Sequence, residues 1–82
     1  MFFVYILYSL NLDRYYVGYS ENLEIRLIEH NQGMSKYTSK AQDWIICYSE
    51  QYMDRIAAHK RELEIKKKKS RKYIEWLIGV NK

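Results

Sequence analysis

Two tyrosines lie in the middle of apolar, β-branched runs near the N-terminus. Tyr5 belongs to the run at residues 3–8 and Tyr16 to the run at residues 15–19. A buried phenol usually needs a hydrogen-bond partner, and Gly18, two residues after Tyr16, leaves the space beside that phenol open to a ligand. Tyrosine is also common in strands for packing alone, so these positions indicate a site only together with other polar groups.

A second pair of polar side chains shares one face of a predicted helix. Arg26 and His30 are four residues apart and flank Leu23 and Leu27, which places all four on the side that faces the core. An arginine at the edge of a core either lays its apolar stem over the surface or needs a partner for its charge. The histidine is either a hydrogen-bonded residue at a helix end or part of the same site.

Glu62 is a candidate metal ligand on a later helix, although its position also suits a surface charge. A helical projection that starts at Met53 predicts the core stripe of this helix to consist of Ile56, Ala57 and Leu63. Glu62 then falls on the flank of that stripe. Lys66 follows it at the i, i+4 spacing of a surface ion pair.

Positive charge is concentrated after Glu62. The 82 residues carry 14 Lys and Arg against 10 Asp and Glu, a formal net charge of +4. Six cations stand close together in the C-terminal half: Lys66, Lys67, Lys68, Lys69, Arg71 and Lys72. These cations repel one another unless a polyanion such as nucleic acid neutralises them. Alternatively, the run is the solvated end of a helix, where cations complement the negative end of the helix dipole.

Three strands and three helices are predicted to position these residues. The strands are expected at residues 3–8, 15–19 and 44–49, and the helices at residues 21–30, 53–68 and 71–78. Ser20 precedes the first helix, Ser70 is expected to cap the last one, and Gly79 to close it. Residues 31–42 are expected to form a long polar loop. Because both faces of the first two strands are apolar, helices should cover much of both sides of the sheet.

Length and composition predict one small domain over residues 1–82. The chain has one cysteine, Cys47, and no cluster with the spacing of a zinc site, which argues against a disulfide framework or a structural zinc. The apolar opening, residues 2–8, is too short to cross a membrane. The expected location is therefore the cytoplasm, without membrane attachment.

The order and spacing of these residues resemble the GIY-YIG nuclease domain. Val4-Tyr5-Ile6 is followed by Tyr16-Val17-Gly18, then by Arg26 in the next helix and Glu62 in a later one. The similarity covers almost the whole chain and is greatest with stand-alone bacterial proteins that consist of this domain only. It implies an α+β fold with a three-stranded antiparallel sheet and elements in the order β-β-α-β-α-α.

The resemblance also implies a role for each of five residues. Tyr5 and Tyr16 together handle the attacking water, and either phenol could accept its proton. Arg26 faces the scissile phosphate, and His30 lies near the nucleophile. Glu62 holds a single Mg²⁺ or Mn²⁺ ion, which should bind weakly without DNA, because Mg²⁺ keeps several waters and takes substrate phosphates as ligands.

The implied substrate is DNA, with RNA left open. The residues expected to hold flanking phosphates are Lys36, Lys66, Lys67, Lys69, Arg71 and Lys72. One departure concerns Tyr19, which stands where excision-repair nuclease subunits with this domain carry a lysine. Because no separate recognition domain is expected, a protein partner could supply sequence specificity.

The sequence therefore predicts a metal-dependent endonuclease that hydrolyses a phosphodiester bond in DNA, by nicking or by selecting a DNA structure. One alternative is a nucleic-acid binding module with negligible cleavage on its own, whose salt-dependent binding would survive Glu62→Ala. Another is a protein-interaction domain that uses the aromatic sheet and has no affinity for DNA at low salt.

Overall fold

Apolar and aromatic side chains on both faces form a long antiparallel hairpin at the start of the chain. It consists of β1 (Phe2–Ser9) and β2 (Arg14–Ser20). The third strand, β3 (Ile45–Tyr52), pairs with the other side of β1, so the strand order is β2-β1-β3 and β2 forms an edge. The computed structural model describes residues 1–80, and the predicted α+β fold with a three-stranded antiparallel sheet is confirmed. The domain range 1–82 stays a prediction and includes two residues outside the described ones.

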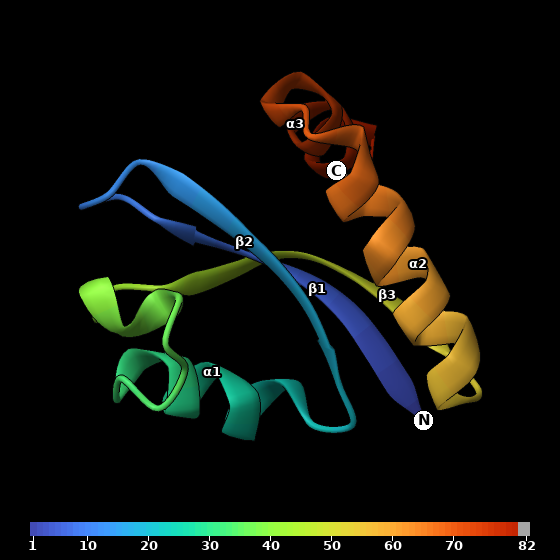
Figure 1. Cartoon of the computed structure of the whole chain (residues 1–82), viewed down its shortest axis with the longest axis horizontal. Helices are drawn as coiled ribbons and strands as arrows, with labels where there is room; N and C mark the ends of the chain where they lie inside the picture. The colour runs from blue at the N-terminus through green and yellow to red at the C-terminus, as the bar shows by residue number, and fades with distance from the viewer. Residues whose placement is uncertain (81–82) are drawn as a thin grey trace.

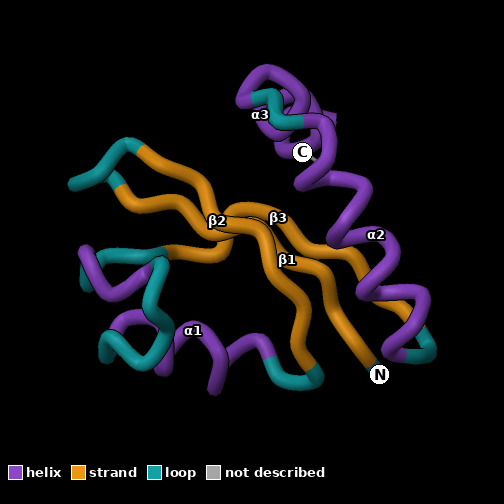
Figure 2. Tube along the Cα trace, viewed as in Figure 1, coloured by secondary structure: helices purple, strands orange, loops and turns teal. Residues whose placement is uncertain are grey.

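Helices cover both faces of the sheet, as Figure 1 shows. On one side lie α1 (Leu23–Asn31) and the short 3₁₀ helix η1 (Thr38–Lys40), and Figure 2 shows how the loop after α1 folds back beside it. On the other side lie α2 (Arg55–Lys68) and α3 (Arg71–Val80). Within residues 1–80, no helix has the length and apolar character needed to cross a membrane.

Each face of the sheet has its own core cluster. Alternate residues of a strand point to opposite faces, so Tyr5 and Leu7 pack with Trp44 on the α1 side. Val4 and Ile6 pack on the other side, where α2 and α3 contribute Ala58, Ile65 and Leu77. The sheet is thus buried on both sides, as its apolar sequence predicts.

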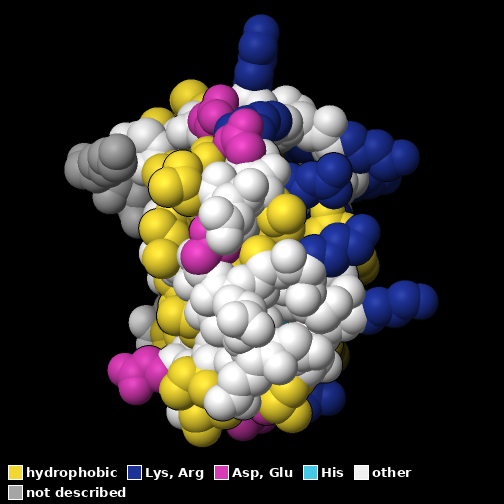
Figure 3. Space-filling view, turned by 90° about the vertical axis from the view of Figure 1, so that its left-hand side faces the viewer, with side chains coloured by type: hydrophobic (Ala, Val, Ile, Leu, Met, Phe, Trp, Pro, Cys, Tyr) yellow, Lys and Arg dark blue, Asp and Glu magenta, His cyan; other side chains and the backbone are white. Residues whose placement is uncertain are grey.

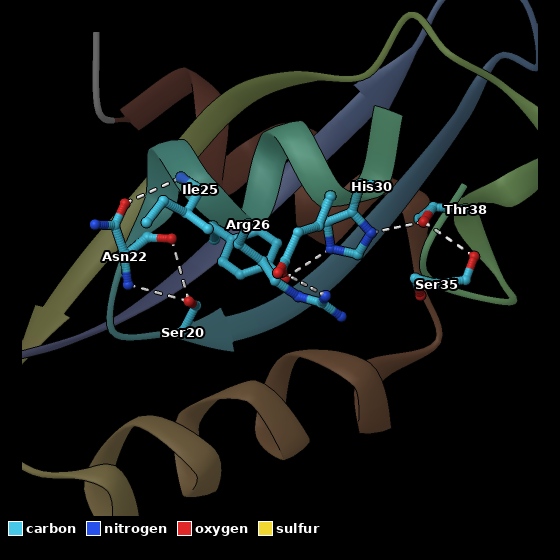
Figure 4. Close-up of polar contacts among 9 residues, drawn as sticks. Ser20, Asn22, Ile25, Arg26, His30, Ser35 and Thr38 are labelled. Carbon is cyan, nitrogen blue, oxygen red and sulfur yellow. Dashed lines mark hydrogen bonds and ion pairs between the residues drawn. The ribbon is translucent and has the colours of Figure 1, made fainter. Parts of the chain in front are cut away.

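Helix boundaries differ from the prediction at four ends: both ends of α1, the start of α2 and the end of α3. Asn22, and not Ser20, caps α1, because its Oδ1 accepts a hydrogen bond from the Ile25 amide at 3.0 Å, as Figure 4 shows. The predicted cap Ser70 is confirmed by the Tyr73 amide, which donates to its Oγ at 3.2 Å. Gly79 does not end α3, which continues to Val80.

The predicted core stripe of α2 is wrong. Ile56 is 82% exposed and Leu63 is 51% exposed, whereas Ala58, Glu62 and Ile65 are the buried residues of this helix. A helix rich in lysine has no dominant apolar face, so scattered aliphatic side chains gave a misleading projection. The small Ala58 side chain marks the true contact, because it lets the helix approach the sheet closely. Glu62 lies on this buried face and not on its flank.

Candidate active site

Tyr5 reaches toward the edge of the sheet because the neighbouring strand has no side chain in its path. Gly18 is the residue opposite Tyr5 in the hairpin. A Cβ atom at Gly18 would lie 2.5 Å from the Tyr5 hydroxyl oxygen and 3.1 Å from Cε2 of Tyr16. The rings of Tyr5 and Tyr16 lie side by side, with centroids 6.5 Å apart. Gly18 therefore makes room for both phenols at one place.

Gly18→Ala is expected to displace the Tyr5 ring. We predict that this substitution lowers the free energy of unfolding by about 1–3 kcal/mol, the usual cost of overpacking, and lowers the rate of any reaction at Tyr5 by about 10²-fold through misplacement. Thermal unfolding and activity assays measure the two effects. Gly79→Ala is the matched control, because a Cβ there meets nothing within 4 Å. Equal stability and activity of both variants would contradict the packing of Tyr5 on Gly18.

His30 connects Tyr5 to the loop after α1. Its Nε2 lies 2.9 Å from the Tyr5 hydroxyl and its Nδ1 lies 2.6 Å from Thr38 Oγ1. The Thr38 hydroxyl can donate to the Ser35 carbonyl oxygen at 3.5 Å, and Figure 4 shows this chain of contacts. A neutral imidazole with its proton on Nδ1 satisfies the whole chain, since Nδ1–H then donates to Thr38 and Nε2 accepts from Tyr5.

Burial sets the protonation state of both groups. Burial, reinforced by the charge of Arg26, lowers the pKa of His30 to about 4, so the imidazole is neutral at pH 7. Burial also raises the pKa of Tyr5 to about 12, although the nearby Arg26 acts in the opposite direction. The resting site therefore holds a protonated phenol that can donate a hydrogen bond to a neutral imidazole.

Thr38 is a site residue that the sequence prediction missed. Its side chain is fully buried, and its carbonyl oxygen accepts a hydrogen bond from the Trp44 indole nitrogen at 2.9 Å. The only sequence signal was its place in a polar loop of unusual length. No helix or strand periodicity applies there, so nothing in the pattern linked it to His30.

Arg26 lies next to Tyr5 on the same face of α1 as His30, as predicted. In Figure 4, both side chains project from α1 toward the same region beside β2. The Arg26 guanidinium pairs with Glu29 at 3.1 Å, and each of these side chains is about one third exposed. An ion pair with this exposure is worth only about 0–1 kcal/mol. A phosphate could therefore replace the Glu29 carboxylate at little cost.

Glu62 comes from the helix layer on the opposite face of the sheet, and Lys66 connects its carboxylate to the Tyr16 ring at the edge strand β2. The Glu62 side chain is 9% exposed, and Lys66 Nζ lies 3.0 Å from its Oε2. The same Lys66 ammonium lies 5.7 Å from the centre of the Tyr16 ring, and the charge of Glu62 contributes to the raised pKa of Tyr5. The carboxylate is thus within electrostatic reach of the phenols.

The residue before Glu62 fixes the rotation of α2. Arg61 donates from Nε and Nη2 to the two carboxylate oxygens of Glu50 on β3, at 2.9 and 3.1 Å. Glu50 also accepts hydrogen bonds from the hydroxyls of Tyr48 and Tyr52. Because neighbouring side chains on a helix point about 100° apart, this anchor on one side of α2 turns Glu62 toward the β2 edge.

The resting site is therefore neutralised by its own side chains. Glu29 lies where a phosphate would bind to Arg26, and Lys66 lies where a metal ion would bind to Glu62. In residues 1–80, no group of three or more His, Cys, Asp and Glu side chains could form a complete metal site. A buried carboxylate with a single ammonium partner fits an ion that keeps several waters and takes further ligands from a substrate, as Mg²⁺ does.

A cationic groove of about 750 Å³ runs from Tyr16 between β2 and the α2–α3 layer. Of the predicted phosphate contacts, it is lined by Lys66, Lys69 and Arg71, and also by Arg14 and Tyr37, which the sequence did not suggest. Lys and Arg side chains gather along one edge of the face in Figure 3.

The remaining predicted phosphate contacts lie outside this groove. Lys36 lines a neighbouring hollow of about 320 Å³ together with Arg14 and Lys40. Lys67 and Lys72 are exposed on the surface. Within the groove, Arg71 already pairs with Asp13 at 2.6 Å and Lys66 with Glu62 at 3.0 Å, so each must leave a carboxylate before it can hold a phosphate.

Comparison with known proteins relates the chain to one family. The family model of the GIY-YIG catalytic domain matches residues 1–74. A UPF0213 protein of Staphylococcus epidermidis is 40% identical over 65 residues, which cover 78% of this chain and 78% of the relative. A UPF0213 protein of Staphylococcus haemolyticus is 38% identical over 52 residues, which cover 62% of this chain and 63% of the relative. No solved structure matches the chain significantly.

Proposed function

The chain belongs to the GIY-YIG family of catalytic domains, and from this premise we propose that it is a metal-dependent endonuclease that hydrolyses phosphodiester bonds in DNA. The observation that supports the proposal most is the grouping of two phenols, an imidazole and a guanidinium beside β2, with a buried carboxylate linked to Tyr16 through Lys66. The cationic groove begins at the same place, which suits a substrate with many phosphates.

Arg26 is proposed to hold the scissile phosphate. A phosphodiester is anionic and gains further charge during attack, so hydrogen-bond donors directed at its non-bridging oxygens lower the barrier. The guanidinium presents a planar fork that matches phosphate geometry. When DNA enters, its phosphate takes the place of the Glu29 carboxylate at Arg26.

Tyr5 and Tyr16 are proposed to flank the attacking water. Because its pKa is about 12, Tyr5 carries its proton at pH 7 and cannot act as a free phenolate. Its hydroxyl can instead donate to His30 Nε2, 2.9 Å away, while it accepts the proton of the water. The negative charge of a bound phosphate raises the proton affinity of the imidazole, so substrate binding favours this transfer.

Glu62 is proposed to hold the divalent ion, Mg²⁺ or Mn²⁺. When bound, the ion supplies positive charge for the oxygens of the reacting phosphate. Lys66 must leave Glu62 for this to happen. Its ammonium already lies over Tyr16 and lines the groove, where it can bind a phosphate instead.

One observation favours a second candidate, DNA binding without cleavage. Both charged members of the site are paired with other side chains of the chain, Arg26 with Glu29 and Glu62 with Lys66. If these ion pairs persisted in the complex, DNA would still bind in the groove, but Arg26 and Glu62 would not contact the phosphate and the metal ion. In that case DNA binding would be salt-dependent and equal in the wild type and in Glu62→Ala.

The proposal predicts that metal removal abolishes DNA hydrolysis. The purified protein should nick or cut at least one substrate in a panel of supercoiled plasmid, duplex, flapped, branched and single-stranded DNA with Mg²⁺ or Mn²⁺, and none with EDTA. A parallel RNA panel tests which nucleic acid is used. Gel electrophoresis of the products measures the result. Absence of cleavage on every DNA and RNA substrate with either metal would overturn the nuclease proposal.

A further inference from the structure

His59 lies beside Glu62 and has no part in the function described so far. It precedes Glu62 by three residues on α2, and the two side chains share one face of the helix. His59 Nε2 is 3.7 Å from Glu62 Oε1. An imidazole nitrogen and a carboxylate oxygen therefore point toward the same space at the β2 edge.

Tyr19 holds the His59 ring in this orientation. The two rings are stacked, with centroids 5.1 Å apart and planes inclined by 30°. Tyr19 follows Gly18 on β2 and packs on the α2 side of the sheet. Although the His59 side chain is half exposed, this contact keeps its ring against the edge strand near Glu62.

The separation of the two atoms suits one shared ion. A metal bound to a histidine nitrogen and a carboxylate oxygen has bond lengths that add up to about 4.2 Å. The 3.7 Å between Nε2 and Oε1 is shorter than this sum, so a single ion can contact both atoms without a movement of the helix.

We propose that His59 Nε2 is a second protein ligand to the ion at Glu62, and that the site consequently prefers a first-row transition metal to Mg²⁺. Imidazole suits the later first-row metals such as Fe²⁺, Ni²⁺ and Zn²⁺ best, whereas Mg²⁺ takes oxygen ligands. Mn²⁺ binds most weakly in this series, so it is the most stringent probe of a preference over Mg²⁺. This inference rests on the proposed function, in which Glu62 holds an ion, and it adds a ligand and a metal class to that site.

The second histidine of the chain does not compete for this role. The sequence contains two histidines, and His30 is fully buried with both ring nitrogens in contact with Tyr5 and Thr38. A nitrogen ligand detected on a bound metal ion should therefore come from His59. This makes a spectroscopic assignment with single variants practicable.

Mn²⁺ binding to the full chain without DNA tests the proposal. The free Mn²⁺ signal in electron paramagnetic resonance gives the affinity, competition with Mg²⁺ gives the preference, and spin-echo modulation reports a directly bound imidazole nitrogen. We expect Mn²⁺ to bind about tenfold more tightly than Mg²⁺, and His59→Gln to lose the nitrogen signal and about tenfold in Mn²⁺ affinity. His30→Gln should keep the signal, and Glu64→Gln, which removes an exposed carboxylate of α2, should keep both properties.

Two results would overturn the inference: no nitrogen signal in the wild type, or Mn²⁺ affinity in His59→Gln equal to that of the wild type. The failure of the nuclease proposal would look different, because metal binding is measured here without DNA. A nitrogen-ligated ion in a protein that cleaves nothing would support His59 as a ligand and contradict the nuclease. Metal-dependent cleavage without a nitrogen signal would support the nuclease proposal and contradict His59 as a ligand.

Discussion

Arg26→Ala is expected to lower the rate of DNA cleavage by about 10²–10³-fold, the usual cost of removing one donor that stabilises developing negative charge. The fold should be unaffected, because Arg26 is about one third exposed and its ion pair with Glu29 contributes only about 0–1 kcal/mol. Arg26→Lys should restore little activity, since an ammonium cannot reproduce the planar two-pronged contact of a guanidinium. Single-turnover cleavage and thermal unfolding measure the two properties.

Glu29→Gln provides the matched control for Arg26. It removes the same ion pair but leaves the guanidinium free for phosphate, so DNA should bind at least as tightly as to the wild type and cleavage should persist. If Arg26→Ala cleaved at the wild-type rate, the guanidinium could not be the group that holds the reacting phosphate. Equal losses in both variants would show that the ion pair itself, and not the arginine, matters.

The parts of the site on regular, strongly patterned elements could be predicted from the sequence. The hairpin places Tyr5 and Tyr16 on one face through strict alternation, and Gly18 on the same face signalled a close approach that the structure contains. The spacing of Arg26 and His30 relative to Leu23 and Leu27 gave the inward face of α1, and the structure buries His30 there.

The contribution of α2 could not be predicted in the same way. Its sequence has lysines on most sides and no dominant apolar stripe, so the projection placed Glu62 on a flank while the structure buries it between Ala58 and Ile65. Its orientation depends on contacts with distant residues, above all the pair of Arg61 with Glu50 on β3. A pattern read along one helix does not contain that information.

Partners that depend on tertiary contacts also escaped the sequence. Thr38 meets His30 through the folding of an irregular loop, and His59 is held by a tyrosine that is distant in the chain. The sequence did contain one indication of a shared site, the i, i+3 spacing of His59 and Glu62. This spacing points to a site only when the helix is known to turn the face with both residues toward the β2 edge.

Glu62 of α2 is proposed to serve the same phosphate as the phenols of the hairpin, although the two come from opposite layers. Comparing Glu62→Gln with Glu64→Gln isolates this claim. Both changes remove one negative charge from the same helix, so they alter long-range attraction to DNA similarly, but only Glu62 is buried at the site, whereas Glu64 is exposed. Glutamine keeps the size of the side chain, and Lys66, which loses its partner, is 44% exposed and can move into solvent.

The direct measurement is the single-turnover rate of DNA cleavage with saturating Mn²⁺ for these two variants and the wild type, with thermal unfolding as the check on the fold. We predict that Glu62→Gln cleaves about 10³-fold more slowly, because the ion contributes several kcal/mol to transition-state stabilisation, and that Glu64→Gln matches the wild type. Cleavage by Glu62→Gln at the rate of Glu64→Gln would contradict the account.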